Sequence, residues 1–398
     1  MGSAADGGSL GEVFGAALRL GLSSFGGPVA HVGYFRREYI ERRGWLDDHE
    51  FAEYLGLSQS LPGPASSQLG IAIGTAQAGP LGGVVSWLGF TLPSAAALVA
   101  LALLTSSTDL SEAGWVHGLK LAAVAVVAQA VAALTASLAP DWPRKLLALA
   151  AAAIALLWTD VLAQVAIIVG GAVAGWLALA AAAPRDGDEA APRTRVGRTA
   201  GVLCLALFAV LLAAVPLSRA AGVDPAVGMA GALYRSGALV FGGGHVVLPL
   251  LDTGVVDPGW VSEDRFLAGY GAAQAVPGPL FSFAAYLGAV ATPMGGVAGG
   301  AVALVAIYLP SFLLLFGVLP FWDDLRRSPG FRRALTGVNA VVVGLLAAAL
   351  YQPVWTGAVS SVVDVAVIVV ALAALVLARL PPIAIVLGCA VAGQAVAG

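Results

Sequence analysis

The sequence predicts an all-α polytopic membrane protein: two repeats of inverted topology with broken or re-entrant helices, joined by a linker and one extra transmembrane helix. Its composition is the first observation. The 398-residue chain is 59% hydrophobic and 11% charged, with a mean hydropathy of +0.90, whereas soluble domains carry about a quarter charged residues. Apolar runs of about 20 residues recur, long enough to cross roughly 30 Å of hydrocarbon.

The second observation is that short motifs occur twice, in the same order and at an offset of about 215 residues. Trp45 and Phe51 also recur, as Trp260 and Phe266. The longer pairs are Phe25-Gly26-Gly27 with Phe241-Gly242-Gly243, Gln59-x-x-Pro62-Gly63-Pro64 with Gln274-x-x-Pro277-Gly278-Pro279, and Leu92-Pro93-Ser94 with Leu309-Pro310-Ser311. We therefore expect an N-terminal repeat in 1–183, a linker and extra helix in 184–221, and a C-terminal repeat in 222–398.

The third observation concerns arginine, which alternates between matched loops. Residues 36–43 contain four arginines and the matching 252–265 only Arg265, while 105–118 contain none and the matching 323–334 contain four. Because cytoplasmic loops of membrane proteins are enriched in Lys and Arg, this alternation predicts that the second repeat is inverted. It places the N-terminus and the linker in the cytoplasm and the C-terminus outside.

Apolar segments over 80–104, 117–139, 144–159 and 161–183 are expected to span the membrane in the first repeat, and 199–217 forms the extra crossing. Residues 10–34 and 50–78 either cross or re-enter. Re-entry is favoured because it keeps the arginines of 36–43 on the cytoplasmic side. A full set of six, one and six crossings is the alternative.

Several functions are not expected. The N-terminus lacks a basic region before an apolar core, so no cleavable signal peptide is predicted. Cys204 and Cys389 stand alone, which gives neither a disulfide framework nor a metal site. Four histidines and the absence of a phosphate-binding GxxxxGK[ST] motif argue against metal chemistry and ATP hydrolysis. We expect no enzyme, no cofactor and no nucleic-acid partner.

The Pro-Gly-Pro motifs should break helices, because proline removes a backbone donor and clashes with the preceding turn. Within hydrocarbon such a break is tolerated only against protein or an aqueous cavity. Pro64 is expected at the first position of a new half-helix, whose amides and the Ser66 and Ser67 hydroxyls would bind an anion. Leu280, Phe281 and Ser282 offer the same in the second repeat. The alternative is a kink that only packs helices.

The Phe-Gly-Gly motifs supply amides that no side chain shields. Arg19 and Arg235 each precede one of them by six positions. An ionisable residue within a membrane segment is a functional candidate, and guanidinium binds oxyanions through paired donors. The alternative is that each arginine extends to the membrane interface.

Coupling to protons needs a group that titrates, and His31 and His245 follow the glycine motifs while Glu53 precedes the first Pro-Gly-Pro. Each histidine could instead be only a hydrogen-bonded residue. The second repeat has Ala268 in place of Glu53, which weakens that candidate. Lys120 is expected at the membrane interface rather than in a binding site.

Four segments then carry a resemblance that covers nearly the whole chain: FGGPVAHVGYFRREYIERRGWLDDHEF, SQSLPGPASSQLGIAIG, FGGGHVVLPLL and GWVSEDRFLAGYGAAQAVPGPLFSFAAYLG. They resemble the two halves of the chromate ion transporter family, long-chain type. The resemblance implies a bacterial inner-membrane protein that exports chromate, driven by the proton motive force as an antiporter, and so gives chromate resistance. The family motifs fall on Phe25 to Pro28, Gln59, Pro62 to Pro64, Phe241 to Gly244, Gln274 and Pro277 to Pro279.

The expected site holds an oxyanion between the two breaks while one repeat rocks against the other. Its residues are Arg19, Phe25, Gly26, Gly27, Gln59, Pro62, Gly63, Pro64, Ser66, Ser67, Arg235, Phe241, Gly242, Gly243, Gly244, Gln274, Pro277, Gly278, Pro279 and Ser282. Chromate, protons and the lipid bilayer are the expected partners, and a homodimer stays open. The alternatives are a permease for sulfate or another tetrahedral oxyanion, and a membrane scaffold or lipid handler.

Overall fold

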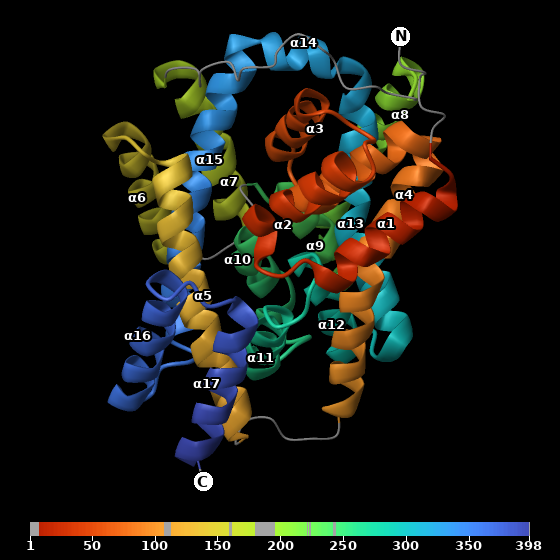
Figure 1. Ribbon diagram of the computed structural model, residues 1–398. Helices are drawn as coiled ribbons and strands as arrows, with labels where there is room; N and C mark the ends of the chain where they lie inside the picture. Colours follow the sequence, from red (N-terminus) through yellow and green to blue (C-terminus); the bar gives the residue numbers. More distant parts are fainter. Residues whose placement is uncertain are drawn as a thin grey trace.

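The computed structural model describes residues 8–106, 113–158, 161–179, 196–220, 222, 224–241 and 244–397 (Figure 1). All regular secondary structure within these residues is helical, and loops connect the helices. The first repeat contains α1 (Leu10–Ser23), α2 (Gly27–Arg36), the π-helical segment η1 (Arg37–Arg42), α3 (Asp48–Ser60), α4 (Ala65–Leu104), α5 (Gly114–Leu138), α6 (Trp142–Leu157) and α7 (Val161–Ala178). The extra helix is α8 (Arg198–Ala220).

The second repeat follows the same order. It contains α9 (Pro225–Leu239), η2 (Gly244–Val246), α10 (Val247–Leu251), the π-helical segment η3 (Asp252–Val256), α11 (Glu263–Ala273), η4 (Leu280–Ser282), α12 (Phe283–Val290), α13 (Gly296–Val318), η5 (Leu319–Phe321), α14 (Trp322–Arg327), α15 (Pro329–Ala349), η6 (Leu350–Trp355), α16 (Val362–Val376) and α17 (Pro382–Ala397). The π-helical segments η1 and η3 recur at matched positions, so the duplication extends to irregular backbone.

Helix α4 is a hairpin of two half-helices rather than one rod. The chain leaves helical geometry at Ala78 and Gly79, where Gly79 has φ +74°, and Pro80 starts the second half. The Ser86 hydroxyl donates to the Gly70 carbonyl at 2.8 Å, so residues 65–77 run back along 80–104. Helices α12 and α13 pack in the same way, with Gly288 against Gly299.

The Pro-Gly-Pro break of the first repeat lies near the middle of the second half of α4. The Ser67 hydroxyl is 3.4 Å from the Tyr308 hydroxyl, and Thr91 contacts that same hydroxyl. The start of α4 is therefore level with Thr91, midway along residues 80–104.

The two broken segments of the first repeat enter and leave at the same end of the molecule. The Gln77 side chain donates to the Trp45 carbonyl at 3.5 Å, and the Gly8 amide donates to Gln77 at 3.4 Å. The second repeat repeats this contact, since the Thr292 amide donates to the Trp260 carbonyl at 3.1 Å. Residues 10–42 and 48–78 are thus hairpins, as the re-entrant interpretation requires.

Two opposite ends of the molecule can be distinguished in Figure 1. We call the end where α14 and the beginning of α3 lie the basic end, because α14 and η1 carry arginines there. Helix α4 finishes at the opposite end, which is also the end where α16 and α17 lie (Figure 1). Between these ends α5 and α15, which hold matching positions in the repeats, run in opposite directions (Figure 1).

Several helical stretches within the described residues could cross a membrane by length and composition. They are Ala65–Leu104, Gly114–Leu138, Arg198–Val215, Gly296–Arg327 and Pro329–Trp355. The expected spans at 80–104, 117–139, 144–159 and 161–183 correspond to the second half of α4 and to α5, α6 and α7. Residues 159 and 180–183 of these spans lie outside the described residues.

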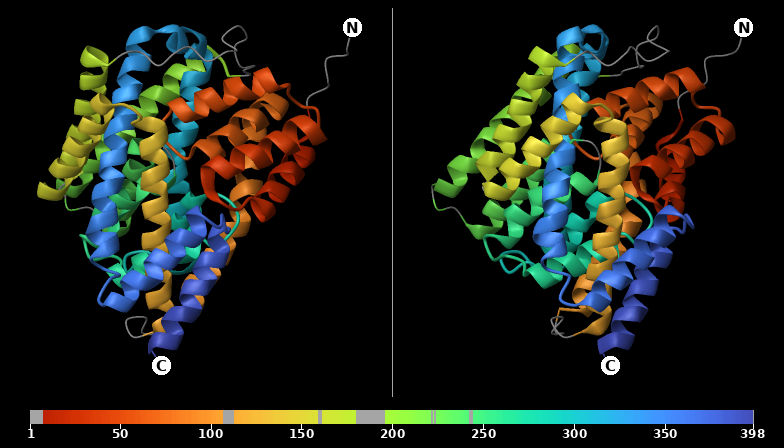
Figure 2. Two further views of the ribbon diagram at one scale, coloured as in Figure 1. Left: turned by 60° about the vertical axis from the view of Figure 1, so that its left-hand side comes forward. Right: turned by 90° about the vertical axis from the view of Figure 1, so that its left-hand side faces the viewer.

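The repeats exchange their last two helices. Helices α6 and α7 pack on α15 of the second repeat, while α16 and α17 pack on α5 of the first (Figures 1 and 2). Matched glycines make both crossings: Gly118 lies against the backbone of Gly393, and Gly337 against that of Gly175. Small residues let helix backbones approach closely where lipid gives no hydrophobic driving force.

Among the described residues helix α8 has no counterpart in either repeat, and it packs on α9 and α13 of the second repeat. The Tyr234 hydroxyl of α9 donates to the Phe208 carbonyl of α8 at 3.1 Å. The corresponding helices of the first repeat, α1 and α4, pack on one another without a helix equivalent to α8. Residues of α9 and α13 that contact α8 therefore have a different environment from the matching residues of α1 and α4.

Candidate functional site

Each Pro-Gly-Pro break is hydrogen-bonded to the other repeat. The Gly63 amide donates to the Val240 carbonyl at 2.7 Å, and the Gly278 amide donates to the Ser24 carbonyl at 2.9 Å. Ser24 and Val240 immediately precede the two Phe-Gly-Gly motifs. The two kinds of motif therefore meet in pairs, each pair made by both repeats.

The repeated Leu-Pro-Ser motifs complete this arrangement. A Cβ at Gly63 would lie 2.6 Å from the Ser311 hydroxyl oxygen, and one at Gly278 would lie 3.0 Å from that of Ser94. Both glycines have positive φ, +127° and +104°. Glycine is therefore needed at both breaks, for conformation and for space.

The first break begins α4 nearly as the sequence predicts. Pro64 was expected at the first helical position, but it is the N-cap residue and the helix begins at Ala65. No side chain caps this helix. The first bond of the helix runs from the Gln68 amide to the Pro64 carbonyl at 2.9 Å, so the preceding three amides have no partner within the helix. Ser66 and Ser67 are buried beside them.

The second break differs in detail. A short 3₁₀ turn, η4, precedes α12, and the Ser282 hydroxyl donates to the Pro279 carbonyl at 2.7 Å. That hydroxyl, expected as an anion donor, is bonded within its own turn. The first repeat thus presents the more open helix start.

Buried polar atoms gather around the breaks. We call Ser24, Gln68, Thr91 and Ser311 the break cluster: Ser24 Oγ, Gln68 Oε1, Thr91 Oγ1 and Ser311 Oγ are buried without a hydrogen bond of normal geometry. The amide end of Gln68 donates to the Pro62 carbonyl at 2.6 Å. Because buried polar atoms in proteins are nearly always hydrogen-bonded, such a group indicates a place for a polar ligand or water.

The candidate proton carriers lie in two places. His31 is buried, with its ring 5.5 Å from the Phe90 ring, and His245 Nδ1 is 2.9 Å from the Tyr270 hydroxyl while its Nε2 faces Gly27. Both histidines are therefore next to the breaks. Glu53 instead lies toward the basic end, 3.1 Å from Arg326 of α14.

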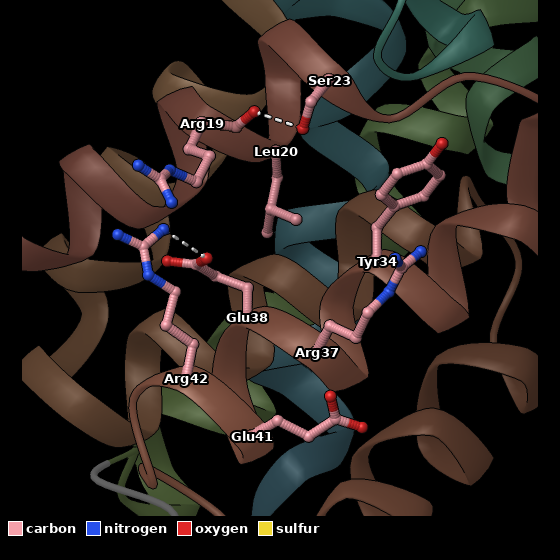
Figure 3. A pocket seen from close by; sticks show the side chains of 8 residues that line it. All are labelled: Arg19, Leu20, Ser23, Tyr34, Arg37, Glu38, Glu41 and Arg42. Carbon is pink, nitrogen blue, oxygen red and sulfur yellow. Dashed lines mark hydrogen bonds and ion pairs between the residues drawn. The ribbon is translucent and has the colours of Figure 1, made fainter.

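The duplicated arginines occupy different environments. Arg19 is exposed in the second half of α1 and lines an open pocket of about 360 Å³ (Figure 3). Arg235 is 7% exposed within α9, the helix that α8 covers. The two guanidinium groups therefore differ in exposure, although their positions match between the repeats.

The remaining expected site residues are placed as follows. Gln59 is exposed, whereas Gln274 is half-buried. Gly26 and Gly27 start α2 with φ of +95° and +76°, as a glycine pair permits. Phe25, Phe241, Pro62 and Pro277 are half-buried, while Gly244 and Pro279 are buried. Gly242 and Gly243 lie outside the described residues.

Sequence reasoning missed two parts of this arrangement. Thr91 and Tyr308 hold matching positions just before the Leu-Pro-Ser motifs and contact one another; the duplicated motif was the available signal. Lys120 was expected at the membrane interface, but it is 8% exposed and pairs with Asp264 of α11. One turn earlier, His117 Nε2 is 2.6 Å from Asp364.

No group of three or more His, Cys, Asp or Glu side chains that could hold a metal ion occurs among the residues that the structure describes. Interlocked repeats, broken helices and a buried polar cluster instead define a polytopic membrane protein with its polar site between two repeats. Comparison with known sequences agrees, because the chain matches the family described as "Chromate transporter" over residues 11–176 and 227–394. The chain belongs to the chromate transporter family.

Named relatives support the assignment. The chain is 30% identical to the "Chromate transport protein" of Pseudomonas aeruginosa, over 85% of this chain and 79% of the relative. It is 30% identical to the "Probable chromate transport protein" of Synechococcus elongatus, over 84% and 81%. An "Uncharacterized transporter" of Methanocaldococcus jannaschii is 24% identical over 85% and 82%. No solved structure matches the chain significantly.

Proposed function

We propose that this protein is a secondary transporter that exports chromate from the cytoplasm, driven by the proton motive force. Membership of the family and the names of the relatives support chromate as the cargo. The observation that carries a binding site is the meeting of both Pro-Gly-Pro breaks with both Phe-Gly-Gly motifs beside buried polar atoms. Sulfate, which shares the charge and tetrahedral shape of chromate, is the second candidate cargo.

The oxyanion is proposed to bind at the first break. The uncapped start of α4 points three backbone amides there, and a helix start carries about half a positive charge. Hydroxyls of the break cluster can turn to donate further hydrogen bonds. Arg235, buried in α9, is the proposed source of additional positive charge, and Gln274 of an additional donor.

Inverted topology in the membrane is part of the proposal. Support comes from the opposite directions of α5 and α15 and from the arginines gathered at the basic end, which we assign to the cytoplasm (Figure 1). The C-terminus is then outside. The two hairpins 10–42 and 48–78 re-enter from the cytoplasmic side, and their breaks lie at mid-depth.

Access to the breaks is proposed to alternate through an ion pair at each end. Glu53 of α3 pairs with Arg326 of α14 at the basic end, and Lys120 of α5 pairs with Asp264 of α11 at the opposite end. Helices α3 and α11 correspond between the repeats, and each leads into a Pro-Gly-Pro break. Each pair thus ties a break to the other repeat, so opening one end requires its pair to separate. Glu53, His31 and His245 remain the candidate carriers of the coupling proton.

The proposed function predicts that everted membrane vesicles containing the protein accumulate labelled chromate. Uptake should saturate, should collapse when the proton gradient is dissipated, and should be inhibited by sulfate. Vesicles without the protein are the control. Uptake that ignores the gradient would contradict the coupling, and no uptake above control would contradict export of chromate. A host that becomes more sensitive to chromate on expression would favour an inward permease.

The break cluster predicts a specific loss of affinity in Thr91→Val, which removes one hydroxyl and keeps the shape. We expect the half-saturating chromate concentration to rise about tenfold or more, since a hydrogen bond to a charged group contributes about 1.5–3 kcal/mol. Thr75→Val is the matched control, because that buried hydroxyl donates to the Ile71 carbonyl of its own helix. Equal effects of both changes would remove Thr91 from the site.

A further inference from the structure

We propose that the open pocket of the first repeat is a loading site, where a tetrahedral oxyanion binds before it reaches the breaks. This inference rests on the proposed oxyanion transport and extends it. The pocket, here the Arg19 pocket, lies between α1 and the α2–η1 segment and has a volume of about 360 Å³. It is lined by Arg19, Leu20, Ser23, Tyr34, Arg37, Glu38, Glu41 and Arg42.

The carboxylates of the Arg19 pocket are already neutralised. Glu38 pairs with Arg42 at 3.2 Å and with Arg43 at 2.7 Å. Glu41 pairs with Arg36, which lies outside the pocket lining. The negative charge of the two glutamates is therefore balanced by arginines, one of which lines the pocket while two lie beside it.

Two arginines of the lining keep their charge available. Among the described residues no carboxylate pairs with Arg19 or Arg37; Arg37 reaches the Gly33 carbonyl at 3.4 Å and lies over the Tyr34 ring, 5.1 Å from its centre. A concave surface with uncompensated positive charge concentrates anions. Guanidinium groups suit a tetrahedral oxyanion in particular, because their donors bind two oxygens at once.

The pocket connects the basic end with the backbone that holds the second break. Glu41 and Arg42 belong to η1, which returns to the basic end, while Ser23 ends α1 and immediately precedes Ser24 of the break cluster. Figure 3 shows the guanidinium groups of Arg19 and Arg42 on the same side of the pocket, with Tyr34 and Arg37 across from them and Ser23 at its upper edge. An anion bound at Arg19 is therefore next to the backbone that holds the second break.

Only the first repeat leaves this arginine exposed in the region that the structure describes. Arg235, its counterpart, is 7% exposed in α9 under α8. Duplicated residues with unequal exposure fit unequal roles: Arg19 captures the anion at the cytoplasmic side, and Arg235 contributes charge inside. The asymmetry would give the transporter its loading direction.

The test compares Arg19→Gln and Arg19→Lys with Arg144→Gln, an arginine paired with Asp141 at the basic end and outside the pocket. In everted vesicles Arg19→Gln should raise the half-saturating chromate concentration about tenfold and change the maximal rate less than twofold, because loading and not translocation is weakened. Arg19→Lys should lie between, and Arg144→Gln should match the parent. An unchanged half-saturating concentration in Arg19→Gln would overturn the loading site.

A second measurement separates this inference from the transport proposal. Titration of sulfate into the purified chain in zwitterionic nanodiscs should show binding that rising salt weakens and that Arg19→Gln reduces. If binding persists while chromate uptake is absent, the transport proposal fails and the pocket stands. If Arg19→Gln alters only binding of vesicles that contain anionic lipid, the pocket holds lipid headgroups and the loading site is overturned.

Discussion

Arg326→Met is expected to destabilise the protein by about 3–5 kcal/mol and to abolish controlled transport. The side chains of Arg326 and Glu53 are only 5% and 10% exposed, so removing the arginine leaves a buried carboxylate without its main counter-charge. Asp323, 2.6 Å from the same guanidinium, loses a partner as well. Denaturation of the purified protein in detergent, followed by its midpoint, measures the loss.

Arg327→Met is the matched control for this prediction. Arg327 is the next residue of α14, is 63% exposed, and pairs with Asp323 at 3.3 Å, so its loss should cost less than about 1 kcal/mol. The double variant Glu53→Gln with Arg326→Met should recover much of the stability, since both charges of the buried pair are then gone. Equal midpoints for Arg326→Met and Arg327→Met would show that the pair does not hold α3 to α14.

The double variant also separates the contribution of the Glu53–Arg326 pair to stability from its contribution to transport. Restored stability without restored transport would show that the two are distinct. In the double variant the ion pair that ties α3 to α14 is gone, so we expect chromate to leak down its gradient after proton-gradient collapse. A double variant that still couples uptake to the gradient would assign closure to other contacts.

Local sequence chemistry predicted the positions of the breaks well. Proline and glycine at 62–64 and 277–279 end one helix and begin the next in the structure, because these residues act on their own backbone. Arginine placement also favoured hairpins over crossings for 10–34 and 50–78, and the contact of Gln77 with Trp45 agrees. Features set by neighbouring residues are thus available from the sequence.

Contacts between repeats were not available from the sequence. Nothing local indicates that α17 packs on α5, or that Lys120 meets Asp264 across 144 positions of chain. Lys120 was therefore assigned to the interface from its position at a helix start alone. Likewise, matched spacing suggested equal roles for Arg19 and Arg235, yet α8 covers only one of their helices. A duplicated motif predicts a similar backbone conformation in both repeats. The neighbours of each side chain depend on the packing of the surrounding helices, which the motif does not reveal.

Gly63→Ala is expected to cost roughly 2–6 kcal/mol of stability and to remove transport. The residue has φ +127°, where an L-amino acid is strained by about 1–3 kcal/mol. The added methyl group would also meet the Ser311 hydroxyl and the Gln68 amide, and overpacking of this kind costs about 1–3 kcal/mol. Any shift that relieves the contact pulls the Gly63 amide from the Val240 carbonyl, 2.7 Å away, and so separates the repeats at the break.

Alanine substitutions at two further glycines separate the cost of backbone strain from the cost of crowding. Gly79→Ala introduces strain at φ +74° without any atom within 4 Å, and Gly33→Ala introduces neither, so the order of loss should be Gly63, Gly79, Gly33. Ser311→Gly should partly rescue Gly63→Ala and leave Gly79→Ala unchanged, because only the first is crowded by that hydroxyl. Denaturation midpoints measure the loss of stability, and vesicle uptake measures the loss of transport. If Ser311→Gly fails to rescue while Gly63→Ala equals Gly79→Ala, backbone strain alone governs the break, and the meeting of Gly63 with the Leu-Pro-Ser serine is not what shapes the site.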